Sequence, residues 1–99
     1  MTTFELLPIQ EELAENAQFL NHPDCQEGLP MTITYYKSIG YRIPWIGYFV
    51  SRNGELVGSG GFKGKPVNGR IEIAYGTFDR FQHQGIGTEI CRLLVQVSL

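Results

Sequence analysis

The stretch from Ile71 to Val97 constrains this chain more than any other part of the sequence. Alternating β-branched and aromatic residues predict a strand over Ile71 to Thr77. A short polar loop follows and ends in two glycines, Gly85 and Gly87. A strand, a glycine loop and a helix N-terminus in this order bring unpaired amides to the positive end of a helix dipole. The stretch therefore predicts a site for a phosphate-bearing ligand. Apolar residues at helical spacing mark the predicted helix: Ile86, Ile90, Leu93, Leu94 and Val97.

Two common phosphate-binding patterns do not fit the sequence. The dinucleotide fingerprint needs a third glycine where Ile90 stands. The run S-G-G-F-K-G-K-P approaches the P-loop pattern, but Ser59 replaces its first glycine and Pro66 replaces its magnesium-binding Ser or Thr. The pattern that remains is the Q-x-x-G-x-G of residues 82–87.

This Q-x-x-G-x-G resembles the pyrophosphate loop of the GCN5-related N-acetyltransferases, with Gln82 in the Gln/Arg position and Gly87 in the Gly/Ala position. The flanking residues extend the resemblance. I-E-I-A-Y, residues 71–75, is similar to the fourth strand of the branch that acetylates ribosomal proteins and small amines, and T-E, residues 88–89, matches the usual helix start. Asp79 is a departure, because proline is frequent there.

The resemblance implies an α+β fold: a mixed, mostly antiparallel sheet flanked by helices, running strand, two helices, three antiparallel strands, helix. It implies an N-acetyltransferase that uses acetyl-CoA and no metal, acting on a primary amine of a protein N-terminus or a small molecule. The pantetheine arm would run along the backbone of Tyr75 and Thr77. The side chain of Gln82 and nearby amides would hold the pyrophosphate. The loop residues expected to bind acetyl-CoA are Gln82, His83, Gln84, Gly85, Ile86, Gly87 and Thr88.

Two alternatives remain open at this point. The same fold can serve as a non-catalytic acyl-CoA-binding or regulatory module, and Gly85 and Gly87 can simply form a structural turn. Turnover of an amine distinguishes the enzyme from the module.

The bulk properties of the chain narrow its class. Its 99 residues suit one domain, and 42% apolar with 18% charged residues is typical of a folded protein. A net charge of −2 disfavours nucleic acid as a partner. No apolar run has membrane-spanning length and no signal pattern opens the chain, so we expect no membrane contact and a cytoplasmic location. His22 and Cys25 lack a second ligand pair, so a surface loop is favoured over a metal site.

The first half of the chain predicts a strand and two helices. A strand is expected over Thr2 to Leu7, and a helix from Pro8, with an apolar stripe of Ile9, Leu13, Ala17 and Leu20. Met31 to Gly40 is ambiguous: its composition favours a strand, while Met31, Tyr35 and Ile39 share one helical face. The resemblance implies a helix here that lines the acceptor entrance. Tyr35 and Tyr36 are then candidate substrate contacts, with simple packing as the alternative.

A hairpin is expected in the middle of the chain. Trp45 to Ser51 and Leu56 to Phe62 read as strands, and Asn53-Gly54 between them is a strong turn signal. Glycines at 58, 60 and 61 predict either that another layer packs closely or that the strand bulges.

Glu72 is the candidate catalytic base. It would share a strand face with Ala74 and Gly76, which are too small to fill the space beside it. An acetyltransferase must deprotonate an ammonium group, which a carboxylate can do directly or through water. A solvated or salt-bridged glutamate is the competing interpretation.

The end of the chain carries no helix stop signal after Leu93 to Val97. The resemblance implies a further strand, helix and hairpin, including a tyrosine general acid. We therefore expect residues 1–99 to form one acetyltransferase domain that is incomplete at its C-terminal side and inactive on its own. The exposed edge of Arg70 to Thr77 and an apolar flank on the last helix (Leu93, Leu94 and Val97) would favour association with a second copy.

Overall fold

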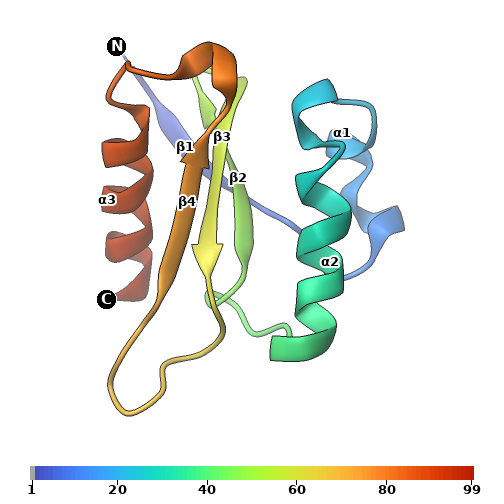
Figure 1. Cartoon of the computed structure of the whole chain (residues 1–99), viewed down its shortest axis with the longest axis vertical. Coiled ribbons are helices and arrows are strands. Elements are labelled where there is room, and N and C mark those ends of the chain that lie inside the picture. Colours follow the sequence, from blue (N-terminus) through green and yellow to red (C-terminus); the bar gives the residue numbers. More distant parts are fainter. Residues whose placement is uncertain (1) are drawn as a thin grey trace.

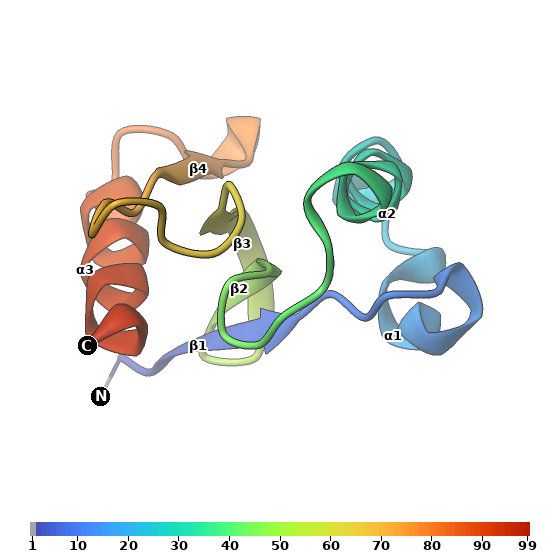
Figure 2. The same ribbon diagram turned by 90° about the horizontal axis from the view of Figure 1, so that it is seen from below.

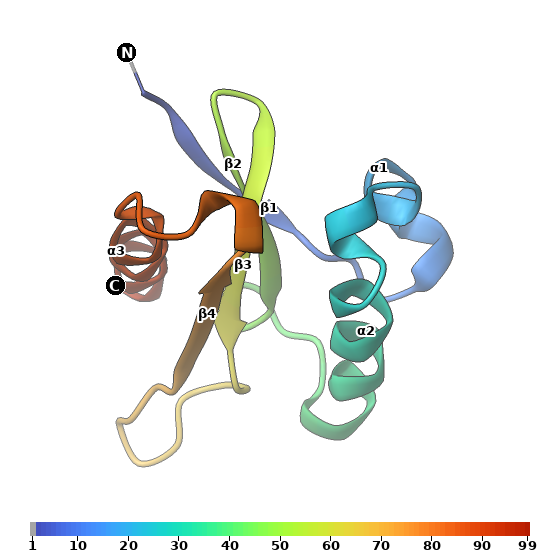
Figure 3. The same cartoon turned by 45° about the horizontal axis from the view of Figure 1, so that its top comes forward.

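The computed structural model describes residues 2–99 and shows a four-stranded antiparallel sheet with helices on both faces (Figures 1 and 2). The strand order is β1-β2-β3-β4. Helix α3 lies on one face, and α1 and α2 lie on the other (Figures 2 and 3). The expected α+β class and order of elements are confirmed. The strands are β1 (Phe4–Pro8), β2 (Gly47–Arg52), β3 (Glu55–Phe62) and β4 (Ile73–Thr77), and the helices are α1 (Ala17–Leu20), α2 (Gly28–Ile39) and α3 (Ile86–Ser98).

The β2–β3 hairpin forms at the predicted turn. Asn53 and Gly54 have φ of 53° and 87°, the positive values that a tight two-residue turn requires. The register between the two strands shifts at Val50 and Ser51, which leaves Val57 as an extra residue in β3. The Val57 carbonyl accepts a hydrogen bond from the Phe78 amide at 2.9 Å. The expected irregularity in the glycine-rich strand is thus a β-bulge.

The glycines of β3 also allow α3 to approach the sheet closely. A Cβ at Gly60 would lie 2.8 Å from Ile90 Cγ2 and 2.9 Å from Leu94 Cδ1. A Cβ at Gly58 would lie 2.9 Å from Ile90 Cδ1. Ile90 and Leu94 are fully buried against this strand. The predicted close layer is therefore α3.

Helix α2 resolves the ambiguous segment and ends at Gly40, as the helical interpretation expected. The shared face of Met31 and Tyr35 points outward, since 65% and 43% of these residues are exposed. The buried residues of α2 are Leu29 and Tyr36. The Tyr36 hydroxyl donates to the Ile9 carbonyl at 2.8 Å and accepts from the Gly47 amide at 2.9 Å. This phenol joins α2 to the end of β1 and the start of β2.

The prediction of a helix that begins at Pro8 is wrong. Pro8 closes β1, and only a 3-10 turn at Leu13–Asn16 and the single turn of α1 follow it. The Asn16 side chain is buried and bonds the Gln10 amide and the carbonyls of Gln10 and Glu12. Such side-chain bonds to local backbone groups compete with a regular helix. Leu13 and Leu20 of the predicted stripe are 48% and 37% exposed, and Phe19 fills the core instead.

Two expectations near the end of the chain are also corrected. β4 begins at Ile73 rather than Ile71, and Ile71 and Glu72 link it to a turn closed by the Val67–Arg70 bridge. Leu94 is buried against Gly60 and is not part of the expected exposed apolar flank on α3. Val97 is exposed as expected, and Val95 is exposed beside it. No helix within residues 2–99 is long and apolar enough to cross a membrane.

Alanine at Gly58 should destabilise the fold. Its Cβ would lie 2.5 Å from the Gly76 carbonyl oxygen, a backbone atom that can move only with β4. We expect a loss of about 1–3 kcal/mol, measured by urea unfolding. Gly76→Ala is the matched control, since a Cβ there meets no described atom within 4 Å. Equal effects of the two changes would contradict the close packing of β3.

Phenylalanine at Tyr36 should also destabilise the fold, because it leaves the Ile9 carbonyl and the Gly47 amide without their buried partner. The expected loss is about 1–3 kcal/mol by chemical unfolding. Tyr35→Phe removes a hydroxyl from a half-exposed side chain and should leave stability unchanged.

The same phenol should make stability depend on alkaline pH. Burial raises the pKa of Tyr36 above its ordinary value, so the folded state holds this proton more tightly than the unfolded state. Its contribution is complete below about pH 10, the unfolded pKa, and falls as pH rises above that value. The alkaline loss of stability should be smaller in Tyr36→Phe than in the unchanged protein. If the free energy of unfolding falls equally with alkaline pH in both proteins, Tyr36 does not cause the pH dependence.

Candidate functional site

The N-terminus of α3 presents bare backbone amides. Gly85 stands at its N-cap with φ of 75°, and no side chain of the described residues caps the helix. The first amides of a helix have no partner within it, so those of Ile86, Gly87 and Thr88 are available to a ligand. The Ile86 side chain is buried and holds the helix start against the core. The arrangement suits an anion, because the helix dipole adds positive potential at this point.

Two arginines border this loop, and sequence reasoning missed both. Arg52 Nη1 donates to Gln84 Oε1 at 3.0 Å. The guanidinium carbons of Arg52 and Arg80 lie 5.5 and 5.3 Å from the centroid of the Phe81 ring. Arg80 stands two residues before Gln82 and was visible in the sequence. Arg52 comes from the end of β2, and no sequence signal links it to the loop.

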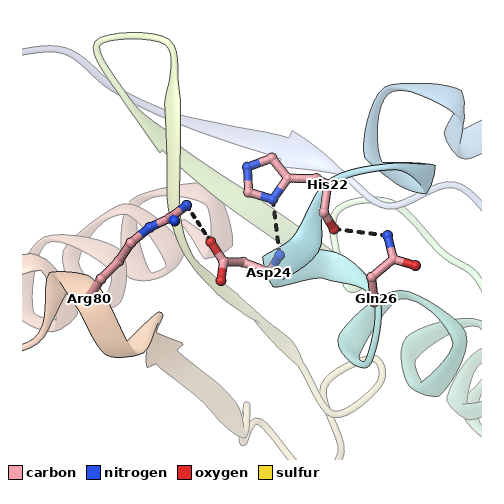
Figure 4. Close-up of polar contacts among 4 residues, drawn as sticks. All are labelled: His22, Asp24, Gln26 and Arg80. Atoms are coloured by element: carbon pink, nitrogen blue, oxygen red, sulfur yellow. Dashed lines mark hydrogen bonds and ion pairs between the residues drawn. The ribbon is translucent and has the colours of Figure 1, made fainter.

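Arg80 also ties the loop to the helical half of the molecule. Its Nη2 lies 2.6 Å from Asp24 Oδ2, and Figure 4 shows the two side chains meeting from separate segments. The Asp24 amide donates to His22 Nδ1, and Gln26 Nε2 donates to the His22 carbonyl. The turn before α2 is thereby connected to the turn before the predicted phosphate loop.

The free edge of β4 leads away from the helix start. The Lys63 amide donates to the Glu72 carbonyl, and the Phe78 amide donates to Val57. The even-numbered residues of β4 therefore point their backbone N–H and C=O groups toward β3. Tyr75 and Thr77 point theirs toward the free edge of the sheet. The Thr77 carbonyl accepts a hydrogen bond from Gln82 Nε2 at 3.0 Å. The expected pantetheine residues thus do carry outward backbone groups, and Gln82 touches one of them.

A cavity of about 390 Å³ lies between α2 and the β2–β4 part of the sheet. It exists because this face of β3 and β4 carries small residues, Ser59 and Gly61 paired with Gly76 and Ala74. Tyr35 and Tyr36 line it from α2. Tyr75 also lines it, and the Tyr75 ring lies 3.6 Å from the position of a Cβ at Gly87. Tyr75 pairs with Gly60, whose Cβ would meet Ile90 and Leu94 of α3, so its ring lies on the α3 face. Tyr75 therefore borders the cavity and the helix start from opposite faces of β4.

Glu72 does not line this cavity. It is exposed and stands one residue before β4, beside a second hollow near Lys63 and Arg70. Among the residues that the structure describes, no carboxylate lines the cavity. The structure thus brings the loop together with Tyr75 and Thr77, and it places Tyr35 and Tyr36 in the cavity on the other face of the sheet. Glu72 lies outside both groups.

His22 and Cys25 belong to no cluster of potential metal ligands within residues 2–99. No three potential metal ligands come together from Thr2 to Leu99. Cys25 is buried rather than in a surface loop, and burial together with the Asp24 charge raises its pKa to about 11. Its thiol is therefore protonated at neutral pH and is a poor ligand and nucleophile.

Comparison with known proteins places this geometry in a family. Residues 10–99 match the model of the acetyltransferase (GNAT) family. Curated proteins and solved structures gave no match. The family match covers most of the chain and includes the uncapped helix start, the open strand edge and all of the cavity lining except Ile9. This chain belongs to the GNAT family of acetyltransferases.

Proposed function

We propose that this protein is an acetyl-CoA-dependent N-acetyltransferase acting on a primary amine of a protein N-terminus or a small molecule. The observation that carries the proposal is a continuous path: uncapped amides at the start of α3, then the outward edge of β4, then the cavity under α2. A phosphate-bearing molecule with an extended arm fits the first two parts, and an amine fits the third.

Each part of the path has a distinct role in the proposal. The amides of residues 84–88 hold the pyrophosphate, with Gln82 and the positive charge of Arg52 beside them. Outward backbone groups of Tyr75 and Thr77 pair with the pantetheine arm as a neighbouring strand would. Bound acetyl-CoA supplies the acetyl thioester. The cavity positions the amine and excludes water, and an outward amide of β4 stabilises the developing oxyanion.

Tyr35 and Tyr36 have unequal freedom to contact the acceptor. The Tyr36 hydroxyl is already engaged by backbone groups, so only its ring is available to the cavity. Tyr35 lines the same cavity and is 43% exposed. We therefore propose Tyr35 as the polar acceptor contact and Tyr36 as an apolar wall.

The remaining expectations belong to the same proposal. Membership of an acetyltransferase family supports group transfer over a purely regulatory acyl-CoA module. The branch that acetylates ribosomal proteins and small amines, a cytoplasmic location and association through the β4 edge stay predictions. The release of free CoA thiol with a panel of amines tests the transfer itself.

Leucine at Gly87 should weaken CoA binding at least about tenfold. A Cβ at Gly87 would lie 3.6 Å from the Tyr75 ring and 3.7 Å from Thr77 Oγ1, so the longer side chain fills the gap that leads from the loop to β4. No backbone strain opposes it, because Gly87 lies within α3 and is not among the residues with positive φ. Isothermal titration calorimetry with CoA measures the effect.

Thr88→Ala is the matched control for Gly87→Leu, since it removes an exposed side chain and keeps the amide. Its CoA affinity should stay within about twofold of the unchanged protein, as expected for recognition by backbone. Thermal unfolding confirms that both variants are folded. Full CoA affinity in folded Gly87→Leu would refute the proposed loop.

Glutamine at Glu72 tests the proposed base. Because Glu72 lies beside the second hollow, it can serve the cavity only through water. If it does, the rate loss in Glu72→Gln should be largest near neutral pH and shrink as the amine deprotonates unaided. The pH–rate profile of Tyr35→Phe is the comparison, because Tyr35 is proposed to contact the acceptor without transferring a proton. A loss of equal size at every pH, or no loss, would remove Glu72 from the mechanism.

A further inference from the structure

The connection between β3 and β4 is unusually basic for this chain. Residues 63–72 hold three of the 8 lysines and arginines (Lys63, Lys65 and Arg70) but only one of the 10 acidic residues, Glu72. The segment therefore carries a charge of +2 in a chain whose net charge is −2. In Figure 1 it forms the long loop below the sheet, at the opposite end of β4 from the phosphate loop.

These cations surround a hollow of about 590 Å³, which we call the basic hollow: Lys63, Lys65, Val67, Asn68, Arg70, Ile71 and Glu72. Within residues 2–99 the ion pairs are Arg80 with Asp24 and Arg92 with Glu89. Lys63, Lys65 and Arg70 thus make no ion pair among the described residues, and their charges are available to a ligand. The single carboxylate of Glu72 offsets only part of this charge.

The basic hollow adjoins the cavity. Lys63 lines both, and no other residue does so. A Cβ at Gly64 would lie 3.6 Å from Ile39 Cβ, so the loop meets the last turn of α2, the helix that carries Tyr35. A molecule that is long enough can therefore reach from the cavity past Lys63 into the basic hollow.

We propose that the acceptor is an acidic peptide whose N-terminal amine enters the cavity and whose carboxylates bind in the basic hollow. This inference rests on the proposed acetyltransferase function and names its substrate class. A small amine would fill the cavity alone and leave three cations without a role. An extended chain advances about 3.3 Å per residue, so the carboxylates lie on roughly the second to fourth residues.

The first measurement is direct binding without acetyl-CoA. Two peptides with free N-termini and C-terminal dyes are compared, one with Asp or Glu at the second to fourth positions and one with Gln there. Fluorescence anisotropy should show tighter binding of the acidic peptide, and the difference should shrink as salt screens the exposed charges. Equal affinities, or a difference that salt does not change, would overturn the proposal.

The second measurement uses Lys65→Gln with Arg70→Gln, a net change of −2. For the acidic peptide we expect affinity to fall about threefold to tenfold and KM for acetylation to rise by a similar factor. Neither value should change for the Gln peptide. Arg92→Gln with Gln96→Glu makes the same net change of −2 on exposed positions of α3 and should leave the acidic peptide unaffected. An equal loss in this control would show a general charge effect and overturn the specific site.

Two further outcomes separate this inference from the function beneath it. Acetylation of acidic and Gln peptides with equal kcat/KM would keep the acetyltransferase and overturn the acidic acceptor. Preferential binding of a single-stranded oligonucleotide at the basic hollow, lost in Lys65→Gln/Arg70→Gln, would assign the cations to phosphates and overturn the peptide. Failure of the underlying function would appear instead as absent CoA binding in calorimetry.

Discussion

The contact between α3 and the glycines of β3 is the constraint on which the rest of this structure depends. Ile90 and Leu94 reach the strand only because Gly58 and Gly60 have no side chains. This packing fixes how deep the helix sits on the sheet. It thereby sets the position of the helix start, where Gly87 lies beside Tyr75 and Thr77 at the strand edge. A helix held farther from the sheet would separate the exposed amides from the free edge of β4.

The two faces of the sheet use small residues in opposite ways. On the α3 face, Gly58 and Gly60 admit large side chains and produce dense packing. On the α2 face, the small residues of β3 and β4 leave a cavity. Helix α2 does not fill it, because Tyr36 anchors the helix over β1 and β2, near Ile9 and Gly47. One glycine-rich strand thus supports a rigid layer behind it and an open site in front of it.

Sequence reasoning succeeded where the signal was local. The Asn53-Gly54 turn, the glycine loop and the amphipathic pattern of α3 each lie within a few residues, and the structure has all three. It failed at the helix expected from Pro8, because buried bonds from Asn16 override the apolar periodicity. It also missed Arg52, which reaches Gln84 across 32 positions of the sequence, and such contacts leave no periodic pattern. The cavity could be anticipated only in part, since the alternation of small residues was visible and the anchoring of α2 was not.

The hydrogen bond from Gln82 to the Thr77 carbonyl has a consequence for the energetics of ligand capture. The strand edge is not bare before a ligand arrives, because an internal donor already occupies its last outward acceptor. A hydrogen-bond donor of a ligand must replace the Gln82 side-chain amide at the Thr77 carbonyl. The enthalpy gained is therefore only the difference between the new hydrogen bond and the one that is lost. A neutral hydrogen bond contributes only about 0.5–1.5 kcal/mol net, and the exchange reduces that further. Under the proposed function, a ligand that displaces Gln82 from Thr77 would free this side chain for the pyrophosphate, so occupation of the edge and of the loop would be coupled.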